Sequence, residues 1–171
     1  MVFNADTPAV LDETAIVGDV PEPPFAHDNP IFRFFRITNS MRQLVARAVE
    51  GSGLSNDEYG VLSGIVNLGR VSPTELAAKL SVPPTTISVY LARFLDRGLV
   101  RRLPNPDDGR SYLVEPTEQG LDVVRFVGPR LRVEADALMA ASDLSFEELM
   151  AALGSLEAAT KTALDADTTN V

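Results

Sequence analysis

The stretch VRRLPNPDDGRSYLVEPTEQG, residues 100–120, decides the fold of this chain. A short apolar and basic run enters a segment of Pro, Asn, Asp and Gly, and the alternating run Ser111–Val114 follows it. Turn-forming residues between two short β-type runs predict a β-hairpin. Three arginines belong to this hairpin, namely Arg101, Arg102 and Arg110. A chain of formal net charge −9 therefore gathers cations around one loop.

Two short helices are predicted directly before the hairpin. Ser72 is expected to cap the first helix, with Pro73 in the first helical position. The pair Pro83–Pro84 starts the second helix, because a first turn leaves its N–H groups unpaired anyway, and Gly98 ends it. Two helices joined by a tight turn and followed by a hairpin form a winged helix-turn-helix. Its second helix fits the major groove of DNA, and its hairpin reaches the neighbouring minor groove.

Longer amphipathic helices are predicted on both sides of this motif. An apolar stripe runs through residues 30–49, Ser55 caps a second helix and Thr117 caps another, which Pro129 is expected to interrupt and kink. Ser145 opens the last helix. The fold class is therefore mainly α with a small β-hairpin wing. The terminal helices carry more apolar surface than one small lobe can cover, which predicts a homodimer. The interface residues expected are Ile31, Phe35, Leu153 and Leu156.

The charge of the chain is unevenly distributed. Residues 70–115 contain seven Lys or Arg and five Asp or Glu, a net charge of +2, which leaves −11 for the rest of the chain. On charge alone, ordinary solvated arginines are the simpler interpretation. Residues 1–28 contain six acidic residues, four prolines and neither Lys nor Arg, and are expected to form a flexible arm outside a single domain at 29–171.

Several classes of function are excluded by what the sequence lacks. The chain has no cysteine and one histidine, His27, so neither a disulfide nor a metal site is expected. No apolar run approaches the roughly 20 residues of a membrane helix, and no signal peptide is visible, so we expect a cytoplasmic, nucleoid-associated protein without membrane contact. No Gly-rich phosphate loop and no nucleophile–base set are present, which argues against an enzyme and against a cofactor.

The segment 54–120 resembles the MarR (multiple antibiotic resistance regulator) family of bacterial transcription factors. The matching stretches are PTELAAKLSVPPTTISVYLARFLDRGLVRR and PNPDDGRSYLVEPTEQG. In the second stretch, Asp108 and Arg110 match the Asp and the second Arg of the family's wing, and Thr117 and Gly120 match its Thr and Gly. The resemblance implies a winged helix-turn-helix lobe at about 54–120 between dimerisation helices at about 30–50 and 117–165.

The resemblance also implies a function. Proteins of this kind are dimeric regulators that bind palindromic operators in double-stranded DNA, and we expect a repressor that a small aromatic or lipophilic ligand releases. The residues expected to contact DNA are Thr85, Thr86, Ser88, Arg93, Arg102 and Arg110. Asp108 and Gly109 are expected to shape the wing, the glycine by adopting a positive φ in the turn before Arg110. The ligand is expected between the lobe and the dimerisation helices, near Phe34, Met41, Tyr59, Leu62 and Arg125.

The sequence departs from the family pattern at the DNA-contacting positions. Gly109 stands where the family often has the first wing Arg, and Val89 where a basic residue is common. The recognition helix therefore has few strong hydrogen-bond donors. This leaves open an alternative in which the winged helix contacts another protein and does not bind DNA sequence-specifically.

Overall fold

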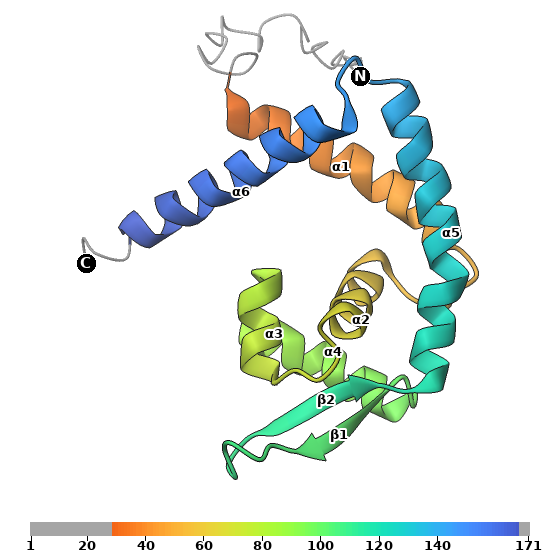
Figure 1. Cartoon of the computed structure of the whole chain (residues 1–171), viewed down its shortest axis with the longest axis vertical. Coiled ribbons are helices and arrows are strands. Elements are labelled where there is room, and N and C mark those ends of the chain that lie inside the picture. Colours follow the sequence, from red (N-terminus) through yellow and green to blue (C-terminus); the bar gives the residue numbers. More distant parts are fainter. Residues whose placement is uncertain (1–28, 168–171) are drawn as a thin grey trace, which may run out of the picture. The chain divides into compact units, whose positions relative to one another are not determined.

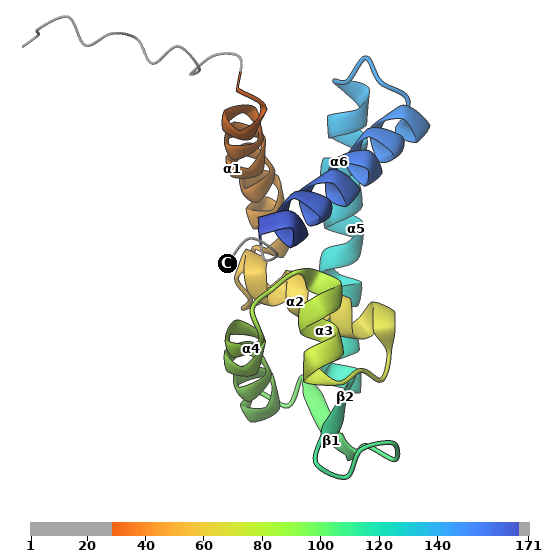
Figure 2. The ribbon, with the colours of Figure 1, turned by 90° about the vertical axis from the view of Figure 1, so that its left-hand side faces the viewer.

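The computed structural model describes residues 29–167 (Figures 1 and 2), and the predicted acidic arm at 1–28 lies outside them. Within the described residues, six helices and one antiparallel hairpin confirm the predicted fold class. The elements are α1 (Pro30–Val49), α2 (Asn56–Leu68), α3 (Pro73–Leu80), α4 (Pro84–Asp96), β1 (Val100–Pro104), β2 (Tyr112–Pro116), α5 (Glu118–Ala140) and α6 (Phe146–Asp167).

The chain divides into two units, and the boundary falls inside α1, between Asn39 and Ser40. In the described part of the first unit, the Ile31 N–H donates to the Asn29 side chain over 2.9 Å, and the rings of Phe32 and Phe35 stack at 6.4 Å. The second unit contains the rest of α1 and all other elements. The single domain expected from residue 29 onward stays a prediction.

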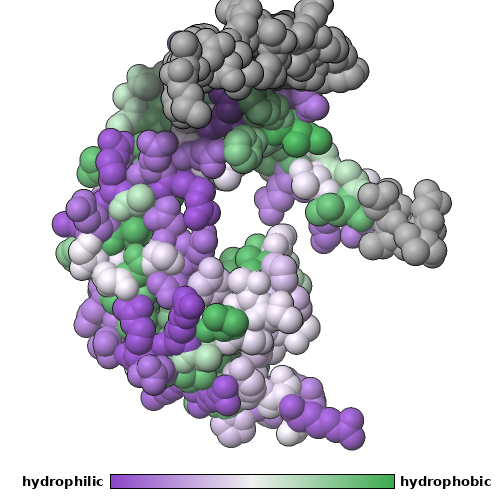
Figure 3. All heavy atoms as spheres, turned by 180° about the vertical axis from the view of Figure 1, so that it is seen from behind, coloured by the Kyte–Doolittle hydropathy of each residue, from purple (hydrophilic) through white to green (hydrophobic). Residues whose placement is uncertain are grey.

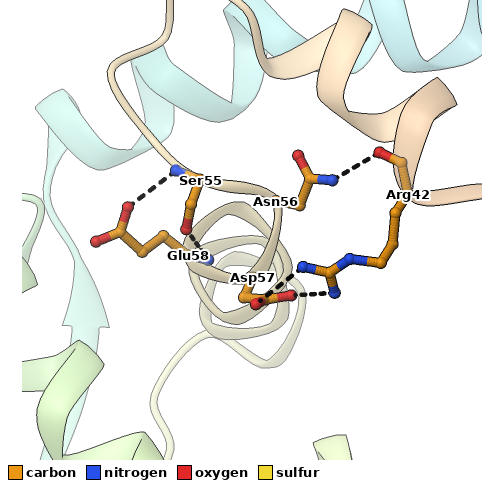
Figure 4. A network of polar contacts seen from close by, with 5 residues as sticks. All are labelled: Arg42, Ser55, Asn56, Asp57 and Glu58. Atoms are coloured by element: carbon orange, nitrogen blue, oxygen red, sulfur yellow. Dashed lines mark hydrogen bonds and ion pairs between the residues drawn. The ribbon is translucent and has the colours of Figure 1, made fainter. Parts of the chain in front are cut away.

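Side-chain caps start the helices at the positions that the sequence predicted. Ser55 forms a complete capping box with Glu58 at the start of α2, as Figure 4 shows. Ser72 and Thr117 accept hydrogen bonds from the N–H groups three residues on. Ser145 and Glu148 exchange hydrogen bonds at the start of α6. These caps satisfy backbone donors that a first helical turn cannot pair within the helix.

The hairpin is fastened to the helical lobe through backbone hydrogen bonds. β1 and β2 pair antiparallel, and a bridge between Val71 and Val114 attaches the segment before α3 to β2 as well. Val114 is fully buried, together with Leu62 of α2 and Phe94 of α4. The wing therefore starts from the hydrophobic core and is not a free appendage.

The first turn of α5, directly after the wing, has no room for a side chain at position 120 and therefore requires Gly120. A Cβ at this position would lie 2.1 Å from the carbonyl oxygen of Leu99, far inside van der Waals contact. The first turn of α5 thus packs directly on the backbone that enters the wing, and Thr117 donates to the Gly98 carbonyl in the same place. The Thr and Gly of the motif together fix α5 against the hairpin.

The expected interruption at Pro129 is wrong, because α5 continues through it, whereas the expected kink at this residue stays a prediction. Proline removes one N–H donor from the helix ladder. The buried side chain of Val127 holds this part of α5 on the core. One missing bond was too weak a signal to predict a break.

Candidate nucleic-acid interface

The outer face of α4 is the first part of the candidate interface. Ile87, Leu91 and Phe94 turn inward and are buried, whereas Thr85 and Val89 are exposed on the opposite face. Helical periodicity alone produces this division, since the buried positions recur at three- and four-residue steps. In Figure 2, α4 and the hairpin occupy the same end of the second unit. The lobe therefore presents a helix face and a wing together.

The small polar side chains of α4 are partly engaged within the helix. The Ser88 hydroxyl donates to the Pro84 carbonyl over 2.9 Å, so its proton is already used, although its oxygen can still accept a hydrogen bond. Thr85 is exposed and Thr86 half-buried. Both line a shallow surface hollow of about 290 Å³ that extends to Arg93. Their methyl and hydroxyl groups suit contact with thymine and with base or phosphate, respectively.

Arg93 of α4 has an ion-pair partner on α2, the carboxylate of Glu58. The guanidinium of Arg93 lies 3.5 Å from the carboxylate of Glu58, so the two side chains form only a weak ion pair. The Ser55 backbone N–H, with help from the Ser55 hydroxyl and Arg93, lowers the pKa of Glu58 against the opposing effect of partial burial. Arg93 is more than half exposed and only weakly held, so it can turn toward another anion.

The tip of the wing is shaped by Asp108. Its side chain accepts from the Arg110 N–H over 3.0 Å, and its carbonyl accepts from the Ser111 N–H over 3.0 Å. The expected role of Gly109 is wrong, because Gly109 is not among the residues with positive φ and a Cβ there would meet open space. The carboxylate of Asp108, and not a glycine conformation, closes this turn.

The arginines of the hairpin differ in what holds them. Arg110 is exposed, and within residues 29–167 its guanidinium forms no ion pair. The guanidinium of Arg102 lies 4.3 Å above the centre of the Tyr112 ring, a cation–π geometry that fixes the side chain without neutralising it. Arg101, in contrast, is bound by Glu115. Of these three arginines, only Arg110 and Arg102 carry a positive charge that is not matched by a carboxylate.

The five residues expected around a ligand differ in their surroundings, and the ligand site they were expected to form stays a prediction. Tyr59 and Leu62 are buried in the core of the lobe, and Arg125 pairs with Glu118 and Asp122 along α5. The other two, Phe34 and Met41, are both partly exposed on α1 and fall on opposite sides of the unit boundary.

A pocket that the sequence did not predict lies between α2, α3 and α4. It has a volume of about 390 Å³, and its wall is largely apolar, with Val61, Leu80 and Val82. Thr86 and Tyr90 of α4 also line it, so the pocket and the outer face of α4 share residues. Sequence periodicity could not reveal it, because the wall is built from side chains of three separate helices.

The rim of this pocket carries an ion pair, shown in Figure 4. The guanidinium of Arg42 on α1 donates to Asp57 of α2 over 2.9 Å, and the Asn56 amide donates to the Arg42 carbonyl over 2.7 Å. The hydrogen bond to Asp57 raises the pKa of Arg42. Asn56 and Asp57 both line the pocket, so its polar side is already ordered by contacts to α1.

The residues expected at a dimer interface are exposed in the single chain. Ile31 and Phe35 are 76% and 62% exposed, and Leu153 and Leu156 are 48% and 40% exposed. Figure 3 shows hydrophobic side chains at the surface of α6. Their exposure leaves these side chains accessible to a partner, and the dimer interface itself stays a prediction.

Comparisons with known proteins agree with this geometry. A sequence profile described as the MarR family matches residues 52–111. The HTH-type transcriptional regulator Mb0904 of Mycobacterium bovis is 32% identical over 105 residues, which cover 54% of this chain and 73% of that protein. The chain belongs to the MarR family. This MarR-family protein is thus a transcriptional regulator, as its relatives are.

Solved structures resemble the fold over most of the chain. The regulator MosR of M. tuberculosis, in complex with DNA, is 25% identical with a TM-score of 0.67, covering 78% of this chain and 97% of MosR. The regulator PcaV of Streptomyces coelicolor, in complex with its natural ligand, shares the fold at 22% identity and a TM-score of 0.69, covering 81% of this chain and 96% of PcaV.

The described residues offer neither a metal centre nor a membrane span. Among residues 29–167, no group of three or more His, Asp or Glu side chains is arranged to hold a metal ion. In that same range, no helix has the length and apolar character required to cross a lipid bilayer.

Proposed function

We propose that this MarR-family regulator is a dimeric repressor that binds a palindromic operator in double-stranded DNA. In this proposal α4 enters the major groove and the wing lies over the adjacent minor groove. The observation that carries the proposal is the Arg110 side chain, exposed and without an ion-pair partner in the described part of the chain, on a turn that Asp108 closes. The DNA complex of MosR, which has the same fold, supports it.

The two parts of the interface would contribute differently to binding. The wing arginines Arg102 and Arg110 supply charge, which attracts every DNA sequence and makes the affinity depend on salt. The α4 face supplies hydroxyl and methyl groups at Thr85 and Thr86, which discriminate between bases but add no charge. Arg93 would add a third positive charge to those of the two wing arginines if a DNA phosphate replaced Glu58 as its partner. Sequence specificity would thus depend on α4 and on DNA shape, and general affinity on the wing.

A second copy of the chain would cover the exposed apolar surfaces of α1 and α6. Ile31 and Phe35 on α1, and Leu153 and Leu156 on α6, are the residues that we place in this interface. A two-fold dimer presents two recognition helices to two half-sites about one helical turn apart, which explains the palindromic operator. Each lobe alone has few base-reading side chains, so binding of both half-sites would be essential.

The pocket beside α4 gives the expected ligand a direct route to the DNA-binding surface. A small aromatic or lipophilic molecule would contact Val61 and Leu80 on one side and Thr86 and Tyr90 on the other. Any shift of α4 that an occupant requires also moves the face that contacts DNA. A ligand that binds the DNA-free arrangement more tightly would therefore release the operator. The ligand complex of PcaV is consistent with such control.

The test is a salt titration of DNA binding with matched variants. The DNAs are a duplex that the parent protein selects from a random pool and a random duplex of equal length. Arg110→Ala should weaken binding to both duplexes and reduce the salt slope by about 0.9 for each phosphate that a wing no longer neutralises. Arg132→Ala, which removes an exposed arginine from α5, is the control and should leave the slope nearly unchanged.

The same titration tests the recognition helix. Thr85→Ala should weaken binding to the selected duplex by about 1–3 kcal/mol, if the contact is to a base, and should leave random DNA unaffected. Equal weakening on both duplexes would instead assign Thr85 to the phosphate backbone.

A protein-interaction module is the second candidate function. The net charge of −9 and the scarcity of cations on the outer face of α4 favour it. If Arg110→Ala bound both duplexes like the parent at every salt concentration, the wing would not be a DNA contact, and this second function would replace the first.

A further inference from the structure

Glu115 is the buried charged residue of the described chain, and it lies at the base of the wing. Its side chain accepts from the Arg70 guanidinium over 2.7 Å through one oxygen and from the Arg101 guanidinium over 2.6 Å through the other. The carboxylate is 11% exposed, whereas the two arginine side chains are 68% and 66% exposed. One shielded anion therefore holds two cations that both reach solvent.

The three residues come from segments that the fold brings together. Arg101 of β1 is directly opposite Glu115 of β2 in the hairpin register, so their pairing fixes the two strands to each other. Arg70 precedes α3, and its neighbour Val71 exchanges two backbone hydrogen bonds with Val114. The ion cluster thus lies beside the only backbone bridge from the described helical lobe to β2, and it reinforces that bridge.

The contacts within the cluster keep Glu115 in its charged form. The guanidinium of Arg70, followed by that of Arg101, lowers the pKa of Glu115 below its ordinary value, so the carboxylate is ionised at neutral pH. Charge-assisted hydrogen bonds to a shielded acceptor are stronger than an exposed surface ion pair. Arg70 and Arg101 would have to give up such bonds before either could bind a phosphate.

We propose that Glu115 is a positioning residue of the DNA-binding surface, which fastens the wing to the lobe and keeps Arg70 and Arg101 from binding DNA phosphates. The second half of this inference rests on the proposed function. The first half concerns the free protein and stands by itself. Glu115 would therefore act on specificity: it places Arg110 correctly relative to α4 and limits the charge that binds any sequence.

Removing the charge of Glu115 should have two opposite effects. A loosened wing lowers affinity for the selected duplex, because the tip no longer starts in the bound position. Two released arginines raise affinity for random DNA, because each gains access to phosphates. The ratio of the two affinities should fall roughly tenfold, within the range that one mismatched base pair in a specific site produces. A residue that only stabilised the fold would weaken both affinities together.

The experiment compares Glu115→Gln with the parent and with Glu118→Gln. The control makes the same charge change at an exposed glutamate that pairs with Arg125 on α5. Titrations use the selected duplex and the random duplex of equal length. For Glu115→Gln we expect tighter random-duplex binding, a salt slope steeper by up to about 0.9 for each phosphate newly bound, and weaker selected-duplex binding. Glu118→Gln should change neither the ratio nor the slope comparably.

A rescue variant identifies the released cation. Arg101→Gln combined with Glu115→Gln restores the parent's net charge, and it should return random-duplex binding and its slope toward the parent values. The selected duplex should stay weakly bound, because the wing is still unfastened. Parallel losses on both duplexes in Glu115→Gln, or an unchanged slope, would overturn the claim that Glu115 keeps the arginines from DNA.

A measurement without DNA separates this inference from the proposed function. Amide hydrogen exchange at Val71 and Val114 reports the bridge between lobe and wing. Glu115→Gln should speed exchange at both amides at least several-fold, and Glu118→Gln should not. Unchanged exchange would overturn the fastening role even if the chain binds DNA as proposed. Faster exchange in a chain that binds no DNA would support the fastening role and refute the proposed function.

Discussion

The winged helix-turn-helix lobe and helix α6 differ sharply in what they bury. The lobe encloses large side chains completely, among them Phe94, Leu62 and Ile65. Over residues 146–165 of α6, no side chain is buried, although the helix carries large apolar residues such as Leu153 and Leu156. Both regions are helical and rich in apolar residues. Composition alone therefore does not distinguish a helix whose apolar side chains are buried in a core from a helix whose apolar side chains stay exposed.

The difference indicates where each region obtains its stability. Each fully buried Leu or Phe contributes roughly 1.5–3 kcal/mol from burial, so the lobe has a source of stability within one chain. A helix that buries nothing gains little beyond its own propensity and caps, such as the Ser145–Glu148 box of α6. We infer that the lobe folds on its own contacts and that α6 depends on a second copy.

The largest expected effect comes from charging the apolar face of α6. The double variant Leu153→Asp/Leu156→Asp should be monomeric at micromolar concentration and bind the selected duplex about 100-fold or more weakly, because two linked half-sites become one. Sedimentation and DNA titration measure both. Thr162→Asp is the control, since it lies half a turn around the helix from Leu153 at 3.6 residues per turn. A stable dimer in the double variant would remove the distinction between the two regions.

A smaller effect is expected from truncating a buried side chain in the core of the lobe. Leu62→Ala should lower the free energy of unfolding by about 2–5 kcal/mol, because Leu62 is fully buried and its removal leaves a cavity. Val89→Ala, on the exposed face of α4, should change it by less than about 0.5 kcal/mol. Urea unfolding provides the measurement.

The Leu62 variant also tests whether the lobe is independent of α6. The loss of stability caused by Leu62→Ala should be the same in the parent and in the Leu153→Asp/Leu156→Asp monomer, since distant sites are additive. A loss that differed between the two backgrounds would show that the core of the lobe depends on the dimer.

The smallest expected effect is a pH dependence that compares one glutamate from each region. Arg70 and Arg101 lower the pKa of Glu115 in the lobe, and the Ser145 side chain, with its backbone N–H, lowers that of Glu148 in α6. A carboxyl with a depressed folded pKa stabilises the fold above its unfolded pKa, roughly 4.3, and loses that contribution as pH falls through the folded value.

The prediction follows from that sign. The melting temperature of the parent should exceed that of Glu115→Gln at pH 7, and the difference should shrink as the pH falls below about 4. Glu148→Gln should show a smaller difference at pH 7, because its partners lie at an exposed helix end. A difference for Glu115→Gln that is constant from pH 7 to pH 3 would mean that its charge does not stabilise the wing.

Local signals in the sequence determined much of this protein. Capping serines and threonines, turn formers and three- to four-residue periodicity predicted the start of each helix and the position of the wing, because these signals act over one or two turns of chain. The motif residues Asp108 and Arg110 indicated the family for the same reason. The failures were also local in origin: Gly109 suggested a positive φ and Pro129 an interruption of α5, and the structure has neither.

Only the tertiary structure decided which charges are free and where a ligand fits. Arg70 and Glu115 are 45 residues apart, and no sequence pattern links them, yet their contact separates a bound arginine from an available one. The pocket beside α4 likewise needs walls from three helices. Such features depend on contacts between segments distant in the chain, and these contacts exist only after the hydrophobic core has brought the segments together.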